Sequence, residues 1–205
     1  HAPLRAGGGG WGGRAARAGN VAPFVTSGNC ASTPVEGAEP RYPFLNMEYQ
    51  LEPGRTGIGR HRGGYGTRRV FRFLTDGVHI SSHTNRHRVK AWGLFDGEDG
   101  SNTIIAFRRR GETEWVRARE AFGTASYGKF SNIVMNEGDE MLFVTPSGGG
   151  YGNPLERDPD LVATDVADEL VSIADARAHY GVVIGDGGAV DAVATEQLRA
   201  KKVKA

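Results

Sequence analysis

The sequence has one cysteine, no long apolar stretch and almost no net charge. Cys30 is the single cysteine in 205 residues, which excludes an internal disulfide and is typical of a reducing compartment. No apolar run approaches the roughly 20 residues that a membrane-spanning helix needs, and we recognise no signal peptide. The formal net charge is +1, so no overall field attracts nucleic acid or an anionic membrane. We therefore expect a cytoplasmic protein with no membrane and no nucleic-acid partner.

Glycine, in contrast, is abundant, with 31 residues or about twice its usual share. Two tracts stand out, RTGIGRHRGGYG at 55–66 and SGGGYG at 147–152. Glycine lets a second backbone approach closely, and these glycines alternate with arginine and tyrosine, so we predict packed loops and not flexible linkers. The glycines expected to form the loops are Gly57, Gly59, Gly63, Gly64, Gly66, Gly148, Gly149, Gly150 and Gly152.

Basic side chains near the two tracts are candidates for holding an anion. Arg60 and Arg62 lie in the first tract and Arg157 follows the second, where each can bind a phosphate or carboxylate beside backbone N–H groups. For Arg157, a structural ion pair with Asp165 is the alternative. Lys129 is a further candidate for contact with an anionic intermediate, or else a solvated lysine. Neither tract has the sequence of a P-loop or a dinucleotide-binding turn, so we expect no nucleotide on this chain.

His79, His83 and His87 recur at intervals of four residues. On a helix, this spacing would place three imidazoles on one face, as a metal site requires. The residues around them favour β-structure, and on a strand residues four apart are separated by about 13 Å. We therefore expect no metal ion on this chain, and these histidines are the candidate ligands if one is bound.

Short β-favouring runs separated by glycine fill the middle of the chain. The runs lie at 68–74, 103–110, 113–120, 131–135 and 140–145. The turn-forming residues 136–139 predict a hairpin between the last two runs. Residues 1–50 show no regular period and are expected to be extended and irregular.

The last quarter of the chain has a helical period. Apolar spacing predicts a helix that begins near Asp160, and Ser172 and Gly181 bracket a second helix. A solvated terminal helix is expected at 191–205. Residues 182–184 lie between these helices and are predicted to form a buried strand.

The predicted fold class is mainly β, a β-rich α+β arrangement of barrel-like antiparallel sheets with short C-terminal helices. We divide the chain into a glycine-rich extended segment at 1–66, an antiparallel β domain at 67–158 and a helical segment at 159–205. All three are expected to belong to one integrated domain.

Six short elements occur in an order that is specific as a set. They are PVEGAE at 34–39, GIGRHRGGYG at 57–66, KFSNI at 129–133, GDE at 138–140, TPSGGGYGNPLERDPDLVATDV at 145–166 and LVSIADARAHYGVV at 170–183. The chain thereby resembles the hydantoinase B/oxoprolinase family, which includes the B-type subunits of N-methylhydantoinase, 5-oxoprolinase, acetone carboxylase and acetophenone carboxylase. It departs from the family pattern at Asp96 and Glu169, where glycine is usual, and at Ser147, where a longer glycine run usually starts.

For the fold, the resemblance implies β-rich, barrel-like sheets that run into a bundle of glycine-rich polyproline II segments. It implies that the chain corresponds to the C-terminal third of a B-type subunit. The N-terminal part of such a subunit carries a motif for a divalent metal, Mn or Zn. A chain that begins with His1 is, on this view, processed or part of a longer protein.

For the function, the resemblance implies one component of an ATP-dependent hydantoinase or carboxylase complex. The A-type partner holds ATP with Mg and phosphorylates a carbonyl oxygen of a cyclic amide, a ketone or bicarbonate. The B-type subunit contributes to hydrolysis or to carbon–carbon bond formation. This chain would be scaffold and cavity wall in a hetero-oligomer, inactive alone, with no catalytic residue assigned.

Two other classes of function remain open from the sequence. The mixture RHRGGYGTRR at 60–69 is also typical of an RNA-binding Arg/Gly module. A free-standing hydrolase that uses Cys30 or a histidine-bound metal is the other, since catalytic groups assemble in space and not in sequence.

Overall fold

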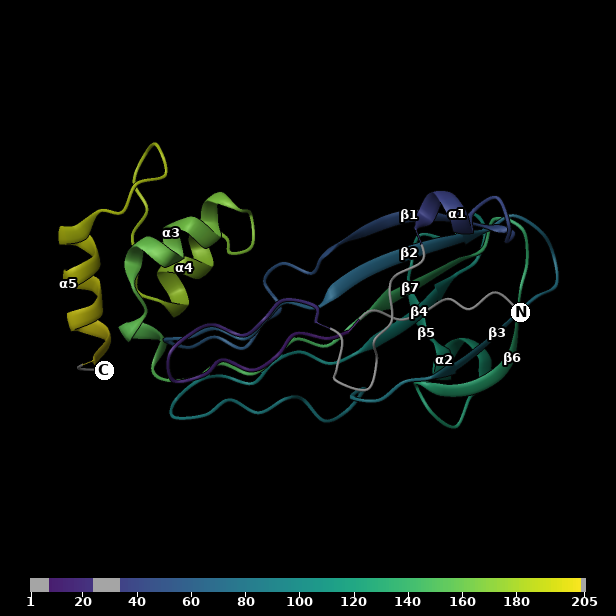
Figure 1. The fold of residues 1–205 in the computed structure, drawn as a ribbon, viewed down its shortest axis with the longest axis horizontal. Helices are drawn as coiled ribbons and strands as arrows, with labels where there is room; N and C mark the ends of the chain where they lie inside the picture. Colours follow the sequence, from purple (N-terminus) through teal and green to yellow (C-terminus); the bar gives the residue numbers. More distant parts are fainter. Residues whose placement is uncertain (1–7, 24–33, 204–205) are drawn as a thin grey trace.

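The computed structural model describes residues 8–23 and 34–203, and its strands form two antiparallel sheets (Figure 1). The larger sheet has the order β1-β2-β7-β4-β5, and the smaller pairs β3 with β6. The strands are β1 Phe44–Leu51, β2 Thr67–Phe73, β3 Val78–His83, β4 Ile104–Arg108, β5 Val116–Arg117, β6 Lys129–Met135 and β7 Glu140–Val144. The helices are α1 Val35–Ala38, α2 Ala118–Phe122, α3 Pro159–Ala167, α4 Ile173–His179 and α5 Ala192–Val203, with a 3₁₀ turn η1 Pro154–Glu156. A mainly antiparallel β fold with a few short helices is therefore confirmed.

The main apolar core lies between the two sheets. Phe71 and Phe73 of β2 occupy one face of the larger sheet, and they belong to one buried cluster with Ile133 and Met135 of β6. Strand β7 lies between β2 and β4, and all five of its residues are buried. The apolar run MLFV thus takes the centre of the sheet, where both of its faces are covered.

The hairpin predicted between residues 131–135 and 140–145 is wrong. The turn exists, since the N–H of Asp139 donates to the carbonyl of Asn136 at 3.0 Å. However, β6 pairs with β3, whereas β7 pairs with β2 and β4. The chain crosses between sheets here because β7 is apolar on both faces, whereas β6 alternates and needs cover on one side only.

Other expectations for the sheets also need correction. In the described part of the chain the larger sheet ends at β1 and β5 and does not close into a barrel. Strand β1 lies in a region expected to be irregular, and a register shift between Asn46 and Glu48 interrupts its alternation. The run at 113–120 forms only the two residues of β5 before α2 begins, and 182–184 contributes a single bridge between Ile184 and Val190.

The three C-terminal helices lie where the sequence places them. The hydroxyl of Ser172 accepts a hydrogen bond from the N–H of Asp175 at 3.0 Å and caps α4. Gly181 follows α4 with a φ of +61°, the left-handed conformation that ends many helices. Around Tyr180, these helices form a second buried cluster at the opposite end of the molecule from the sheets (Figure 1).

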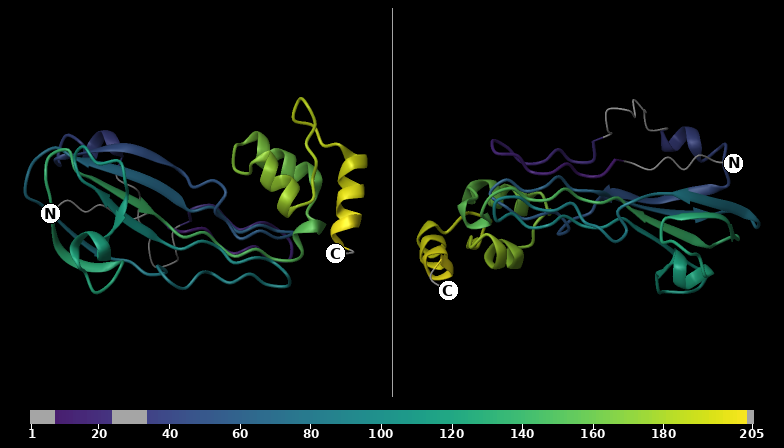
Figure 2. Two further views of the ribbon diagram at one scale, coloured as in Figure 1. Left: turned by 180° about the vertical axis from the view of Figure 1, so that it is seen from behind. Right: turned by 90° about the horizontal axis from the view of Figure 1, so that it is seen from below.

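Long glycine-rich segments connect the sheets to the helices, and Figures 1 and 2 show several of them side by side. Residues 52–66 leave the larger sheet after β1 and return to the same place, since Leu51 pairs with Thr67. We call residues 8–13, 17–22, 55–66, 91–100 and 146–152 the glycine segments. Their backbones exchange hydrogen bonds at many points, so they are packed structure. Polyproline II geometry for these segments stays a prediction.

Membrane insertion by a helix finds no support in the described residues, none of whose helices is both long and apolar enough to cross a bilayer.

Candidate functional site

The segment 146–152 lies at the centre of the glycine segments. The N–H of Gly148 donates to the carbonyl of Gly64 at 3.1 Å, and its carbonyl accepts from the N–H of Gly57 at 2.9 Å. Two positions further on, the N–H of Gly150 donates to the carbonyl of Glu98 at 2.8 Å. One strand of backbone thus bonds to two neighbouring segments, which satisfies polar groups that side chains do not reach.

The close approach of these backbones explains the glycines. A Cβ atom added to Gly148 would lie 2.0 Å from the carbonyl oxygen of Trp11, and one added to Gly63 would lie 2.0 Å from the carbonyl oxygen of Gly148. Of the nine predicted loop glycines, eight have a backbone atom within 1.9–2.7 Å of such a Cβ. The ninth, Gly152, has a φ of +76°. The two glycine tracts of the sequence are therefore in direct contact.

A buried ion cluster joins the glycine segments to α3. The guanidinium of Arg62 donates to both carboxylate oxygens of Asp165, with Nη2 to Oδ1 at 2.9 Å and Nε to Oδ2 at 3.0 Å. Arg157 donates to Oδ2 from the other side, with its Nη2 at 2.8 Å. Burial alone would lower the pKa of Arg62, but hydrogen bonds to Asp165 hold it above its ordinary value. Two cations share one carboxylate, which leaves the cluster one positive charge in excess.

Two tyrosines enclose this cluster. The guanidinium of Arg62 lies 4.7 Å from the ring centre of Tyr65, and that of Arg157 lies 5.8 Å from the ring centre of Tyr180. Burial raises the pKa of Tyr180 to about 12 and also raises that of Tyr65. Both phenols therefore stay protonated at neutral pH, and the hydroxyl of Tyr65 donates to the carbonyl of Leu170 at 3.3 Å. The arrangement fixes the helices to the glycine segments and provides no general base.

Arg60 differs from its neighbour Arg62 because its side chain is 56% exposed. Its guanidinium lies 3.7 Å from Glu156, a distance at which an exposed ion pair contributes little stability. Beside it, burial lowers the pKa of His61, and the charges of Arg60 and Arg157 lower it further, so this imidazole is neutral at pH 7. Of the predicted anion-binding arginines, Arg60 has the most accessible side chain.

The structure does not bring Lys129 to the same place. Lys129 is the exposed first residue of β6, at the end of the molecule opposite to α3 (Figure 1). Its backbone N–H donates to the Ser126 hydroxyl at 3.2 Å, far from the ion cluster. A role of Lys129 at an anionic intermediate remains a prediction with no geometric link to the arginines.

The three histidines are spread along β3 and beyond it. His79 and His83 pair with Val134 and Lys129 across the small sheet, whereas His87 lies past the strand and bonds to the Thr84 hydroxyl at 2.8 Å. Within residues 8–23 and 34–203, no three His, Cys, Asp or Glu side chains come together as a metal site. Cys30, the nucleophile of the alternative hydrolase, lies outside the described residues.

Sequence reasoning missed a network of arginines and acids at the end of the larger sheet. Arg72 of β2 and Arg108 of β4 both bind Glu140 of β7, because the strand register aligns all three residues. Burial would raise the pKa of Glu140, but hydrogen bonds from both arginines lower it below its ordinary range. Next to it, Asp139 binds Arg109 at 2.5 Å. The GDE motif was visible in the sequence, but the strand order that brings the arginines to it was not.

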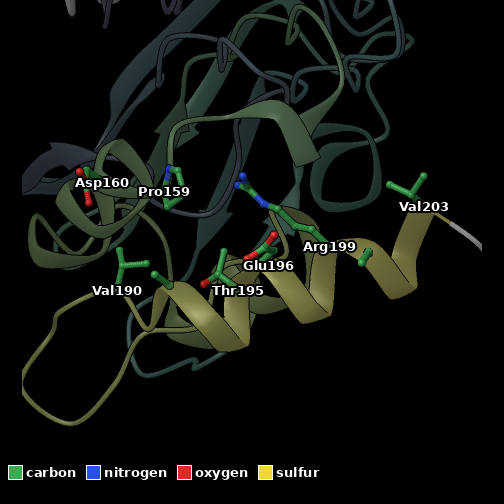
Figure 3. A pocket seen from close by; sticks show the side chains of 9 residues that line it. Pro159, Asp160, Val190, Thr195, Glu196, Arg199 and Val203 are labelled. Carbon is green, nitrogen blue, oxygen red and sulfur yellow. The ribbon is translucent and has the colours of Figure 1, made fainter.

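A cavity of about 590 Å³ lies between the start of α3 and α5 (Figure 3). Its lining is mostly apolar and includes Val190 and Val203. The side chain of Arg199 points away from α5 and donates to the carbonyls of Tyr180 at 3.1 Å and Arg157 at 2.7 Å. Its charge is therefore used in holding α5 to the rest of the helical end.

Comparison with known proteins identifies the family. A profile described as hydantoinase B/oxoprolinase matches residues 3–154, about three quarters of the chain. The chain belongs to the hydantoinase B/oxoprolinase family. Among its relatives is the B-type subunit of a D-/L-hydantoinase from Pseudomonas sp. (strain NS671), which is 34% identical over 191 residues, covering 93% of this chain and 31% of the relative.

Solved structures agree with this assignment. The crystal structure of an ATP-dependent caprolactamase from Pseudomonas jessenii matches with a TM-score of 0.74 and 29% identity, covering 94% of this chain and 32% of that one. A nucleotide-free acetone carboxylase matches with a TM-score of 0.77 over 97% of this chain and 30% of its own. At 21% identity the second match establishes a shared fold only. The chain thus spans about a third of the length of these relatives.

Two departures from the family pattern have a structural explanation. Asp96 has a φ of +69° and Glu169 a φ of +58°, conformations in which glycine is the usual residue. Ser147, the third departure, is buried and exchanges hydrogen bonds with Ser101. Its hydroxyl accepts from the N–H of Ser101 at 2.7 Å, and the Ser101 hydroxyl accepts from the N–H of Ser147 at 3.1 Å. All three positions therefore keep a glycine-segment or helix-end geometry with a different residue.

Proposed function

We propose that this chain forms part of a B-type subunit in an ATP-dependent complex that hydrolyses a cyclic amide. The observation that carries the proposal is membership of the hydantoinase B/oxoprolinase family together with 29% identity to an ATP-dependent caprolactamase over 94% of the chain. The likeness to acetone carboxylase lies below the identity at which activity transfers, so carboxylation is the second candidate.

Within that complex, the chain's own residues act as scaffold and cavity wall. The glycine segments form a rigid element whose shape is fixed by backbone hydrogen bonds, and the cluster of Arg62, Arg157 and Asp165 locks it to the helices. Arg60 is the side chain best placed to meet a phosphate or carboxylate, because it is exposed and its ion pair with Glu156 is long. The amide carbonyl would be phosphorylated elsewhere, on an A-type partner subunit.

ATP with Mg is assigned to that A-type partner, and a divalent metal, Mn or Zn, to the N-terminal part of the B-type subunit. The described residues of this chain offer no cluster suited to such an ion, so its chemistry lies outside them. The expected partners are the A-type subunit, the rest of the B-type subunit and a small-molecule substrate, in a cytoplasmic hetero-oligomer.

An Arg/Gly module for RNA fits the structure less well. Residues 60–69 run through the packed glycine segments into β2, and Arg62 is held by Asp165. RNA-binding segments of this composition normally present free arginines to the nucleic acid. Salt-sensitive retention of RNA on a filter would nevertheless revive that function.

Co-purification tests the proposal. The chain, carrying an affinity tag, is purified from its source cells, and the polypeptides bound to it are identified by mass spectrometry. We expect a large ATP-binding polypeptide in constant proportion to the tagged chain. Recovery of the chain alone as a monomer would overturn the proposed subunit role.

A further inference from the structure

Residues 84–103 form a long projection that leaves β3, runs along the outer edge of the glycine segments and returns to β4. In Figure 1 it is the blue-green ribbon along the lower edge of the molecule. The two halves are joined by backbone hydrogen bonds, from the N–H of Thr103 to the carbonyl of Arg86 at 2.9 Å and from that of Gly100 to Ala91 at 2.8 Å. The returning half packs on segment 146–152, so the other half faces outward.

The outward half carries unusually exposed apolar side chains. Trp92 and Phe95 are each 71% exposed, although large aromatic residues normally bury most of their surface. Val89 and Leu94 are exposed beside them. Four such residues within seven positions form a continuous patch of the kind that marks an interface. We call these four residues, Val89, Trp92, Leu94 and Phe95, the aromatic strip.

The backbone at the tip of the projection is strained in a way that displays the strip. Phe95 and Asp96 both have positive φ, at 52° and 69°, and the N–H of Gly97 donates to the carbonyl of Leu94 at 3.1 Å. Positive φ is rare for a bulky residue and is retained where it serves a function. Here the turn points an aromatic ring into solvent, where it contacts only the ring of Tyr151, at 5.0 Å between centres, among described aromatic residues.

Three basic residues border the strip. Arg86, Arg88 and Lys90 are exposed, and none of them forms an ion pair with an acidic side chain of the described chain. An apolar centre with a polar, charged rim is the usual composition of a protein interface. The complementary surface would carry apolar residues at its centre and Asp or Glu at its edge.

We infer that the aromatic strip packs against the remaining two thirds of the B-type subunit. The chain spans about a third of its relatives, so a large body of protein exists in them to cover the strip. Apolar interfaces of this kind are typical of permanent contacts, as between parts of one subunit, whereas transient partners meet through more polar surfaces. The inference rests on the proposed function, because it takes the B-type subunit as the setting.

Photocrosslinking identifies what covers the strip. p-Benzoylphenylalanine is incorporated in place of Phe95, the source cells are irradiated, and crosslinked peptides are sequenced. Crosslinks to B-type subunit sequence outside these 205 residues are expected. Crosslinks to the ATP-binding polypeptide, to a second copy of this chain, to RNA or to lipid would overturn the inference. So would the absence of any crosslink from an assembly that still contains the ATP-binding polypeptide.

A substitution pair separates this inference from the proposed function. Trp92→Ala combined with Phe95→Ala removes the strip, and we expect about a tenfold or greater loss of the assembled protein. The isolated chain should keep its urea midpoint, because both side chains are exposed. Val193→Ala, at another exposed apolar position on α5, should leave assembly unchanged. If wild type assembles and the double variant assembles equally well, the inference fails while the subunit role stands; if wild type does not assemble, the subunit role fails first.

Discussion

Replacing Gly148 with alanine places a methyl group where the backbone of another segment already lies. The added Cβ would be 2.0 Å from the carbonyl oxygen of Trp11, 2.2 Å from its carbonyl carbon and 2.6 Å from the N–H nitrogen of Gly12. All three are backbone atoms, so no side chain can rotate away. Relief requires the segments to move apart, which stretches the hydrogen bonds of Gly148 to Gly64 and Gly57.

The cost follows from these contacts. Overpacking that the surroundings cannot absorb costs about 1–3 kcal/mol or more, and each weakened backbone hydrogen bond adds about 0.5–1.5 kcal/mol. Together these terms give about 3–5 kcal/mol, a large part of the roughly 5–15 kcal/mol that stabilises a domain. With a urea dependence of about 2 kcal/mol per molar, Gly148→Ala should lower the unfolding midpoint by about 2 M.

Gly37→Ala is the matched control. Gly37 lies in α1, where an added Cβ meets nothing within 4 Å, and alanine is favoured over glycine in a helix by up to about 1 kcal/mol. Urea unfolding followed by circular dichroism should show the midpoint of Gly37→Ala unchanged or raised. If the two alanine variants unfold within about 0.5 kcal/mol of each other, the close packing of the glycine segments is refuted.

Three further changes test other parts of the structure. Asp165→Asn leaves two buried arginines without an anion and should cost about 3–5 kcal/mol, whereas Glu156→Gln, at an exposed pair, should change urea stability by less than about 0.5 kcal/mol. Glu140 has a lowered pKa in the folded protein, so its contribution is present above its ordinary value of 4.5 and lost as pH falls below it. Glu140→Gln should therefore flatten the decline of the urea midpoint between about pH 6 and pH 3, and an unchanged pH profile would contradict this. Glu169→Gly removes a side chain from a left-handed residue and should raise the thermal midpoint by an amount equivalent to about 0.5–1 kcal/mol, whereas Glu196→Gly, inside α5, should lower it; equal shifts would refute the argument.

The sequence predicted the role of glycine better than the arrangement of the strands. Close backbone approach at Gly63 and Gly148 follows from the residue type and its clustering, although the partner of each glycine does not. The hairpin at 136–139 failed because turn residues fix a local reversal, whereas the choice of sheet depends on how many faces of β7 are buried. Pairing is a long-range property that local patterns do not contain.

The same limit applies to the candidate site. An ion pair of Arg157 with Asp165 was foreseeable, because the two residues are eight apart at the start of a helix. The second arginine in the cluster, Arg62, comes from 103 residues away and could not be placed from sequence. The network around Glu140 was missed for the same reason, since its arginines come from two other strands. Residues joined by the fold, and not by the chain, are the ones that sequence reasoning leaves out.

The coupling of ATP to amide hydrolysis tests the central claim most directly. The complex purified through this chain is supplied with ATP and a set of cyclic amides, and ADP and the ring-opened product are measured together. The account predicts ADP formation in fixed proportion to ring opening by the complex, and no ring opening by the isolated chain. Ring opening by the isolated chain without ATP would contradict it.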